Sequence, residues 1–296
     1  PRTRYGTDTV DGAASALSLS IAPIKQVVWL RFLPAYVESL RRFGLRAADT
    51  LIRERIIAVV RHAYGGLNLE IRTEKPTDFK LVSEVEIAGP DPNGFGLIGY
   101  DNTPGKDVGN LRLYDKIGGV NALTQDDGYP GYGGIFVESL FGFSEHPNSL
   151  AEPLDPTDAD FDRLFDTFRP DVSNQPIQAK ELVGFSPLSS GDACPATARN
   201  EAITCAVWSL GSLIGTTVAH EIAHSLGLAD PGGSGFHNGD DFPSALMDQG
   251  SQRSFRERAE IRGHSPGAFC AHNYAYLAEI LPSLDPDPQA SREECF

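Results

Sequence analysis

The segment that most constrains this chain is residues 202–219, AITCAVWSLGSLIGTTVA, which contains no charged side chain. Its length approaches that of a membrane span. It also contains Cys, Ser, Thr and two glycines, and it leads directly into the polar pair His220-Glu221. We therefore predict a buried core helix over 203–226, with no membrane span, and expect the rest of the fold to pack around it.

The end of this predicted helix carries residue types that bind metals. His220 and His224 are four residues apart, so a helix places both imidazoles on one face. Neutral imidazole is a preferred zinc ligand. Glu221 lies beside the pair, where it can hold and deprotonate a zinc-bound water. The spacing thus predicts one catalytic zinc ion, with Glu221 as the catalytic residue of a hydrolase.

A third ligand is expected after the helix. Gly227 can end the helix in a left-handed conformation without steric cost, which turns the chain back towards the metal. Asp230 then arrives three residues later, and a carboxylate oxygen is an acceptable zinc ligand. We favour Asp230 for its spacing. His237 stays open as a replacement or additional ligand, or as a substrate-binding residue.

The run from His220 to Asp230 matches the pattern HExxHxxGxxD and resembles the metzincin metallopeptidases, in its snapalysin-like variant. The family's second mark is a methionine in a tight turn beneath the zinc. Met247, the only methionine of the chain, fits that mark in distance and in its local sequence SALMD. Some members place a tyrosine two residues later, but this chain has Gln249, so the residue that stabilises the oxyanion is unassigned.

The resemblance covers residues 203–250 well and the earlier chain only loosely. It implies a zinc-dependent endopeptidase, a monomer that binds an extended peptide or protein substrate along an edge strand of its sheet. By analogy Gly133–Leu140 is the candidate edge strand, with an interior core strand as the alternative. Two other functions stay open. One is a zincin whose third ligand is Glu257 or Glu260 from a later helix, and the other is a catalytically silent zinc-containing binding module.

Periodicity predicts an α+β fold in a single domain, residues 1–296. The resemblance implies that this fold is zincin-like and that the domain is catalytic. Strands are expected at 26–32, 67–72, 81–87 and 132–141, and helices at 47–64, near 158–168, at 203–226 and near 272–281. The upper subdomain, 1–227, would contain a mixed twisted sheet and two long helices. The lower subdomain, 228–296, would be small, mostly irregular and closed by the last helix.

Composition narrows the partners and the compartment. The net charge of −15 argues against nucleic acid and anionic membranes. The four cysteines form no CxxC pair, and their local pairing suggests the disulfides Cys194–Cys205 and Cys270–Cys295. Disulfides would indicate a secreted or cell-envelope protein. The chain has neither an initiator methionine nor an apolar leader, which fits an exported, mature form.

Two loops rich in acidic residues, Asp91–Asn93 and Asp126–Gly128, are candidates for structural calcium. Ordinary turns explain them about as well, because Asp, Asn and Gly favour turns for backbone reasons.

Overall fold

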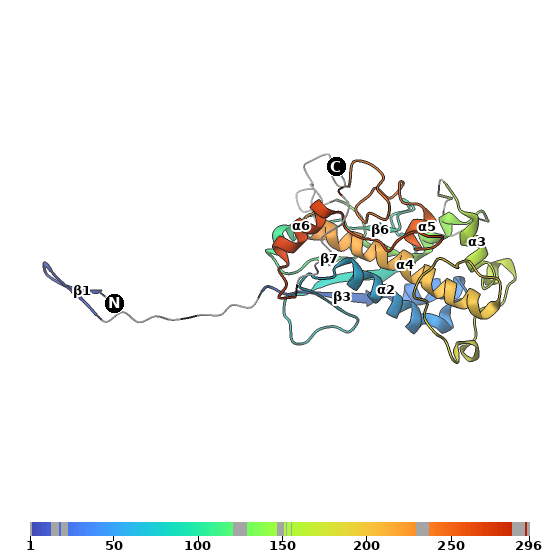
Figure 1. Cartoon of the computed structure of the whole chain (residues 1–296), viewed down its shortest axis with the longest axis horizontal. Coiled ribbons are helices and arrows are strands. Elements are labelled where there is room, and N and C mark those ends of the chain that lie inside the picture. Colours follow the sequence, from blue (N-terminus) through green and yellow to red (C-terminus); the bar gives the residue numbers. More distant parts are fainter. Residues whose placement is uncertain are drawn as a thin grey trace.

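The structure is a computed structural model, and it describes residues 2–12, 18, 23–120, 129–146, 151, 153–154, 156–228, 237–285 and 294. The predicted ligand Asp230, Cys295 and the candidate calcium loop Asp126–Gly128 lie outside these residues. The fold is α+β with a mixed sheet, as the sequence predicted (Figure 1).

The main sheet has six strands, and its spatial order is β4-β3-β5-β8-β6, with the short strand β7 also pairing with β5. All pairings are parallel except that of β6 with β8, which is antiparallel. Four of these strands fall where the sequence predicted strands. The strands are β3 (Gln26–Phe32), β4 (Leu69–Arg72), β5 (Ser83–Ala88), β6 (Gly99–Tyr100), β7 (Lys116–Ile117) and β8 (Gly134–Phe136).

Of the two alternatives for Gly133–Leu140, the edge strand is wrong and the interior strand is confirmed for Gly134–Phe136. β8 lies between β5 and β6 and is fully buried, and the chain from Val137 to Phe143 continues as a 3-10 helix, η3. The antiparallel edge is instead β6, a two-residue strand inside a loop-rich stretch where no pattern predicted a strand. An interior position explains why Gly134–Phe136 is entirely apolar, since both of its faces are covered.

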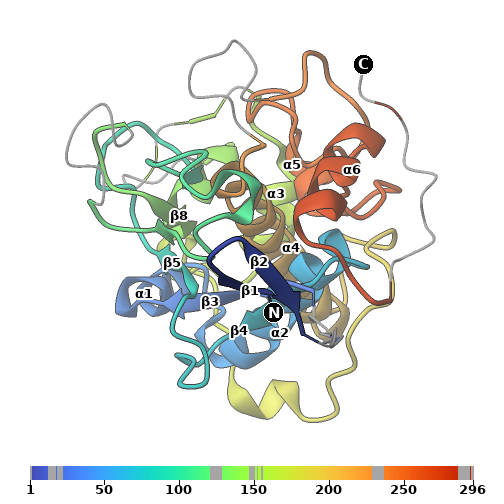
Figure 2. The same cartoon turned by 90° about the vertical axis from the view of Figure 1, so that its left-hand side faces the viewer.

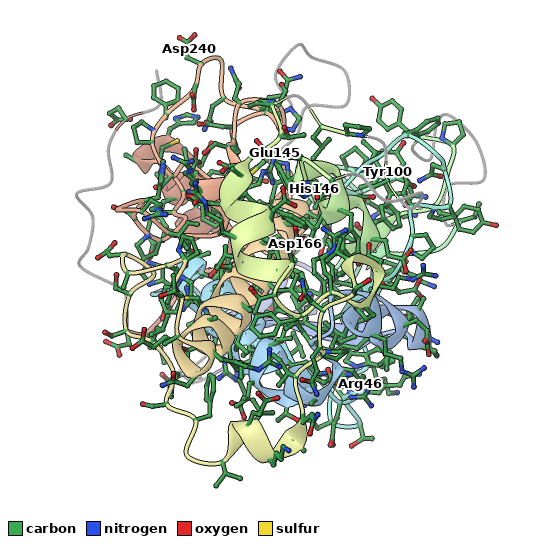
Figure 3. All side chains as sticks on the ribbon, turned by 90° about the vertical axis from the view of Figure 1, so that its right-hand side faces the viewer. Arg46, Tyr100, Glu145, His146, Asp166 and Asp240 are labelled. Atoms are coloured by element: carbon green, nitrogen blue, oxygen red, sulfur yellow. A yellow bond between two sulfur atoms is a disulfide. The ribbon has the colours of Figure 1, made fainter. Side chains whose placement is uncertain are left out.

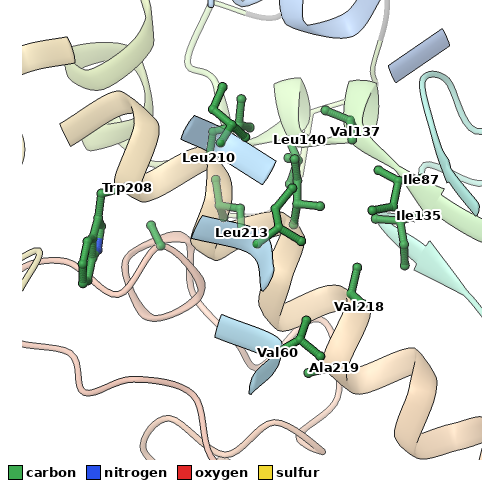
Figure 4. Close-up of a cluster of buried hydrophobic side chains, with 14 of the residues drawn as sticks. Val60, Ile87, Ile135, Val137, Leu140, Trp208, Leu210, Leu213, Val218 and Ala219 are labelled. Carbon is green, nitrogen blue, oxygen red and sulfur yellow. The ribbon is translucent and has the colours of Figure 1, made fainter. Parts of the chain in front are cut away.

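Two long helices pack on each other beside the sheet, α2 (Asp49–Ala63) and α4 (Arg199–Ser225). Gly211 and Gly215 of α4 lie one turn apart where α2 crosses. A Cβ atom added at Gly215 would come within 2.7 Å of the Val59 Cβ. The two glycines of the uncharged segment therefore let the helices approach closely. Figure 4 shows side chains of α4, α2, β5, β8 and η3 meeting in one apolar cluster.

The uncharged segment forms a core helix. By length and apolarity α4 could cross a membrane, but 94% of its most apolar stretch is buried inside the protein. It is the only such helix among the residues that the structure describes. Figure 2 shows α4 between the strands on one side and the C-terminal helices α5 (Phe255–Arg258) and α6 (Ala271–Ile280) on the other.

The remaining elements are short. Two strands near the N-terminus form an antiparallel hairpin, which Figure 1 shows apart from the main sheet. The predicted Cys194–Cys205 disulfide is present and joins the start of α4 to the loop before it. Cys270–Cys295 is not tested, because Cys295 lies outside the described residues. The remaining short strands and helices are β1 (Arg2–Tyr5), β2 (Asp8–Asp11), α1 (Pro34–Arg42), η1 (Arg46–Ala48), η2 (Val108–Asn110), α3 (Ala159–Phe165), η4 (Pro170–Val172) and η5 (Ala179–Leu182).

Candidate functional site

The last two turns of α4 carry His220, Glu221 and His224 at the floor of a cleft. The Nε2 atoms of His220 and His224 lie 2.9 Å apart. The Nδ1 atom of His220 lies 2.5 Å from the carbonyl oxygen of Leu246, so this nitrogen donates its proton there. That hydrogen bond fixes the tautomer of His220 and leaves the Nε2 lone pair directed into the site.

His237 joins the two helix histidines. Ligand atoms of His220, His224 and His237 all lie within 4.8 Å of one another, as the ligands of a single metal ion would. The His237 ring stacks on His220 with centroids 5.3 Å apart, and it meets His224 edge-on at 5.2 Å. The structure thus brings together three of the four predicted ligands, while the position of Asp230 is not described.

The segment around Met247 holds His237 in place. Asn238, the next residue, donates its backbone N–H to the Met247 carbonyl at 2.9 Å. The fully buried carboxylate of Asp248 accepts the Asn238 side-chain amide and the Phe242 backbone N–H, both at 2.6 Å. Met247 itself is buried in the main core. Together with the bond from His220 to Leu246, these contacts support two of the three histidines from one short turn.

Glu221 is enclosed by the edge strand. Its Oε2 atom accepts the backbone N–H of Asp101 at 2.8 Å, directly after β6. A Cβ atom added at Gly99 would come within 2.5 Å of the Thr217 methyl group and would also overlap Glu221. Only glycine therefore allows β6 to lie this close to α4. Neither contact was predicted from the sequence, because β6 is too short to show a strand pattern.

Burial dominates the electrostatics of the site. It raises the pKa of Glu221 to about 8, while the Asp101 N–H and the Arg258 guanidinium favour the charged form and oppose that rise. Burial lowers the pKa of His224 to about 3, with a further contribution from His237, and it lowers the pKa values of His220 and His237 too. All three imidazoles are therefore neutral at pH 7, the form that binds a metal.

Gly227 ends the helix as predicted, with φ at +108°. Its N–H bonds to the His224 carbonyl, and the Leu228 N–H reaches back to Ala223. Tyr276 of α6 covers this end by donating its hydroxyl to the Leu226 carbonyl at 2.7 Å. A residue from the C-terminal part of the chain thereby donates a hydrogen bond to a carbonyl group at the end of α4, just after the histidines.

The cleft above the histidines has a volume of about 750 Å³. One wall is the stretch from Phe95 to Asp101, which contains β6, and the opposite wall is formed by residues 249–254 and Arg258. Arg253 and Arg258 are both buried, and Arg258 anchors its guanidinium on the carbonyls of Arg253 and Gly250. A cleft open along an edge strand, with two buried cations in the facing wall, fits an extended ligand.

The alternative glutamate ligands are engaged elsewhere. Glu260 pairs with Arg55 and accepts hydrogen bonds from the Ser212 hydroxyl at 3.2 Å and the Gly267 N–H at 3.1 Å. Glu257 faces Arg253 at 3.5 Å. Among the described residues neither belongs to a group of candidate metal ligands.

A second group of candidate ligands, His146, Asp162 and Asp166, lies near α3 (Figure 3). The guanidinium of Arg169 is fully buried against it, 2.7 Å from Asp166 and 3.7 Å from Asp162. A cation therefore already neutralises these carboxylates, and ion pairing explains the group.

At Asp91, both carboxylate oxygens accept backbone N–H groups, at 2.8–3.1 Å, which favours a turn over the predicted calcium site.

No family model, no curated protein and no solved structure matches this chain.

Proposed function

We propose that the protein is a zinc-dependent endopeptidase. The observation that carries this proposal is the convergence of three neutral imidazoles, from His220, His224 and His237, beside a buried glutamate at the floor of an open cleft. Three nitrogen ligands with one side left open to a cleft are typical of catalytic zinc, whereas structural zinc sites are closed by four protein ligands. Asp230 remains a candidate for the third or an additional ligand.

Zinc held there would supply a Lewis acid that polarises a peptide carbonyl and lowers the pKa of water. The residues of the chain supply the rest. Glu221 takes the proton of the attacking water and passes it to the leaving amine, the role of a general base and general acid. The Asp101 N–H orients that carboxylate. The edge of β6 away from β8, which pairs with no strand in the described part of the chain, would bind the substrate main chain.

The runner-up is a zinc-containing binding module without catalysis. The placement of Glu221 argues against it, because a structural site needs only the ligands and gains nothing from burying an extra carboxyl group beside them. The Cys194–Cys205 disulfide supports the accompanying proposal of an exported protein.

Replacing Glu221 with glutamine tests the function directly. We expect Glu221→Gln to lower kcat on a peptide library by roughly 10²–10⁴-fold, because the amide cannot accept the proton. The zinc content, measured by elemental analysis, should stay at the wild-type value, since Glu221 is not a ligand. A fully zinc-loaded wild-type protein that cleaves no peptide in the library would instead favour the binding module.

A further inference from the structure

The wall of the cleft that faces β6 contains two buried arginines. Residues 249–254 and Arg258 line this wall, and Arg253 and Arg258 are only 3% and 6% exposed. A guanidinium group stays charged at neutral pH, so burying it is costly unless hydrogen bonds and a paired anion replace the lost water. The partners of the two arginines therefore show whether the charge of this wall is compensated within the protein.

Arg258 is held in a fixed orientation by neutral groups. Its Nε atom donates to the Arg253 carbonyl at 3.1 Å, and its Nη2 atom donates to the Gly250 carbonyl at 2.9 Å. These bonds use two of the five N–H groups of the guanidinium. In the described part of the chain the other three make no hydrogen bond, and Arg258 makes no ion pair there. The guanidinium is therefore positioned by the protein but has no anionic partner among these residues.

The carboxylate that this part of the chain supplies is engaged with Arg253. Glu257 faces the Nε atom of Arg253 at 3.5 Å. The Nη1 atom of Arg253 lies 3.5 Å from the Leu246 carbonyl, which also accepts the hydrogen bond of His220. Its Nη2 atom is buried and has no partner among the described residues. Within those residues, two guanidinium groups thus share one ion-paired carboxylate, and Arg253 contacts the carbonyl that orients a predicted zinc ligand.

The charge of Arg258 acts on the floor of the cleft. Burial lowers the pKa of Arg258 to about 9, with Arg253 adding to the fall, so the group remains charged at pH 7. Burial is also the main cause of the lowered pKa of His237, and the charge of Arg258 lowers it further. In Glu221, that charge opposes the rise in pKa that burial causes. The positive wall therefore stands within electrostatic reach of the groups proposed to bind zinc and to cleave the substrate.

A carboxylate is the ligand group that fits this wall best. The planar guanidinium can bind it through two parallel hydrogen bonds, and the pairing neutralises the buried charge. A peptide carbonyl could accept one of the free N–H groups but would leave the charge uncompensated. The acidic residues that line the cleft, Asp101 and Glu221, are joined on the β6 side by the bond from the Asp101 N–H to the Glu221 carboxylate. We therefore expect the anion to come from the ligand.

We propose that Arg258 selects peptides that carry an acidic side chain close to the bond to be cleaved, and that it binds the carboxylate of that side chain. This inference names the substrate class of the proposed endopeptidase and rests on that function, whereas binding of the carboxylate itself needs no catalysis. The net charge of −15 gives the whole protein no long-range attraction for acidic peptides. Selection would therefore come from the contact with Arg258.

Matched peptides that differ only in Glu or Gln at one position test this selection. Both peptide ends are blocked, and the substitution is moved along the positions on either side of the cleaved bond. We expect one position at which Glu raises kcat/KM by about tenfold or more over Gln. In Arg258→Met the ratio should approach one, because methionine has neither charge nor N–H groups. Arg258→Lys should keep part of the preference, since lysine retains the charge but cannot make two parallel hydrogen bonds.

Binding to an inactive variant separates the substrate class from catalysis. In zinc-loaded Glu221→Gln, calorimetric titration should show that the Glu peptide binds about tenfold or more tightly than the Gln peptide, and adding Arg258→Met should remove this difference. Arg61→Met, which removes a positive charge at an exposed position outside the cleft, should preserve the preference. If acidic peptides bind in this way but the wild type cleaves none of them, the endopeptidase function fails and the ligand class stands.

Equal kcat/KM and equal binding for Glu and Gln peptides at every position would overturn the proposal and leave the endopeptidase function intact. So would an Arg258→Met protein that loses activity on both peptides by the same factor, because Arg258 would then act on Glu221 or on the scissile carbonyl. A preference that appears only when the peptide C-terminus is free would assign the carboxylate to the chain end and contradict the side-chain source. If Arg258→Met does not fold, the wild-type ratio and Arg258→Lys decide.

Discussion

The two halves of the candidate site were built in different ways. The helix-borne half consists of His220, Glu221 and His224, which one regular element presents at fixed spacing. The loop-borne half consists of His237 and the two segments that support the site, Gly99–Asp101 and Leu246–Asp248. The first half needs only helical geometry, whereas the second needs contacts between separate segments, which are 26 positions apart for His220 and Leu246 and 120 apart for Asp101 and Glu221.

This difference teaches where precision in the site comes from. The helix provides two metal ligands and a carboxyl group, but it does not orient them. Orientation comes from loop-borne groups, since the Leu246 carbonyl fixes the His220 ring and the Asp101 N–H fixes the Glu221 carboxylate. If this division is correct, changes in the loop-borne half should alter binding and catalysis, and changes in the helix packing should alter stability.

The largest effect is expected from removing the loop-borne ligand. His237→Ala should weaken zinc binding by more than about 100-fold. Loss of a residue that only hydrogen-bonds to a metal ligand already lowers metal affinity by about 10–100-fold, and a direct ligand contributes more. Zinc affinity would be measured by competition with a chelating dye, in parallel with Asp230→Ala. His264→Ala is the control, since that histidine belongs to no candidate ligand group among the described residues. Normal affinity in His237→Ala with loss in Asp230→Ala would assign the third ligand to Asp230.

A smaller effect is expected at the edge strand. Gly99→Ala adds a methyl group that overlaps Glu221 and the Thr217 methyl group, so β6 must move away from α4. Because a displacement near 1 Å can cost 10²-fold in rate, we expect kcat to fall by roughly 10–100-fold while zinc content stays unchanged. Steady-state peptide cleavage with parallel elemental analysis measures both quantities.

Gly239→Ala is the matched control for this variant, because a Cβ atom there would meet nothing within 4 Å. It should leave kcat unchanged. A Gly99→Ala enzyme with wild-type kcat would show that the close approach of β6 does not orient Glu221.

The sequence predicted the helix-borne half and most of the sheet, since both depend on local patterns. The strand at 26–32 and the helix end at Gly227 lie where expected. The position of β8 stayed open between an edge and the interior, because a short apolar run has the same appearance in both places of a sheet. The hydrogen bonds by which Asp101 and Asp248 support the site were not predicted either. A single polar residue in a loop does not indicate which distant residue it will bond to.

The smallest effect is expected from the helix packing. Gly215→Ala places a methyl group 2.7 Å from the Val59 Cβ, which forces α2 and α4 apart. Overpacking of this kind costs about 1–3 kcal/mol, and the better helix propensity of alanine offsets about 1 kcal/mol of it. We expect the free energy of unfolding in urea to fall by up to about 2 kcal/mol, with zinc affinity and kcat/KM unchanged because the histidines lie more than a turn away. Asn200→Ala is the control for an alanine substitution at an exposed position of the same helix, where no packing contact changes. A Gly215→Ala protein of normal stability but reduced zinc affinity would contradict the division between the two halves, because the helix packing would then position the ligands.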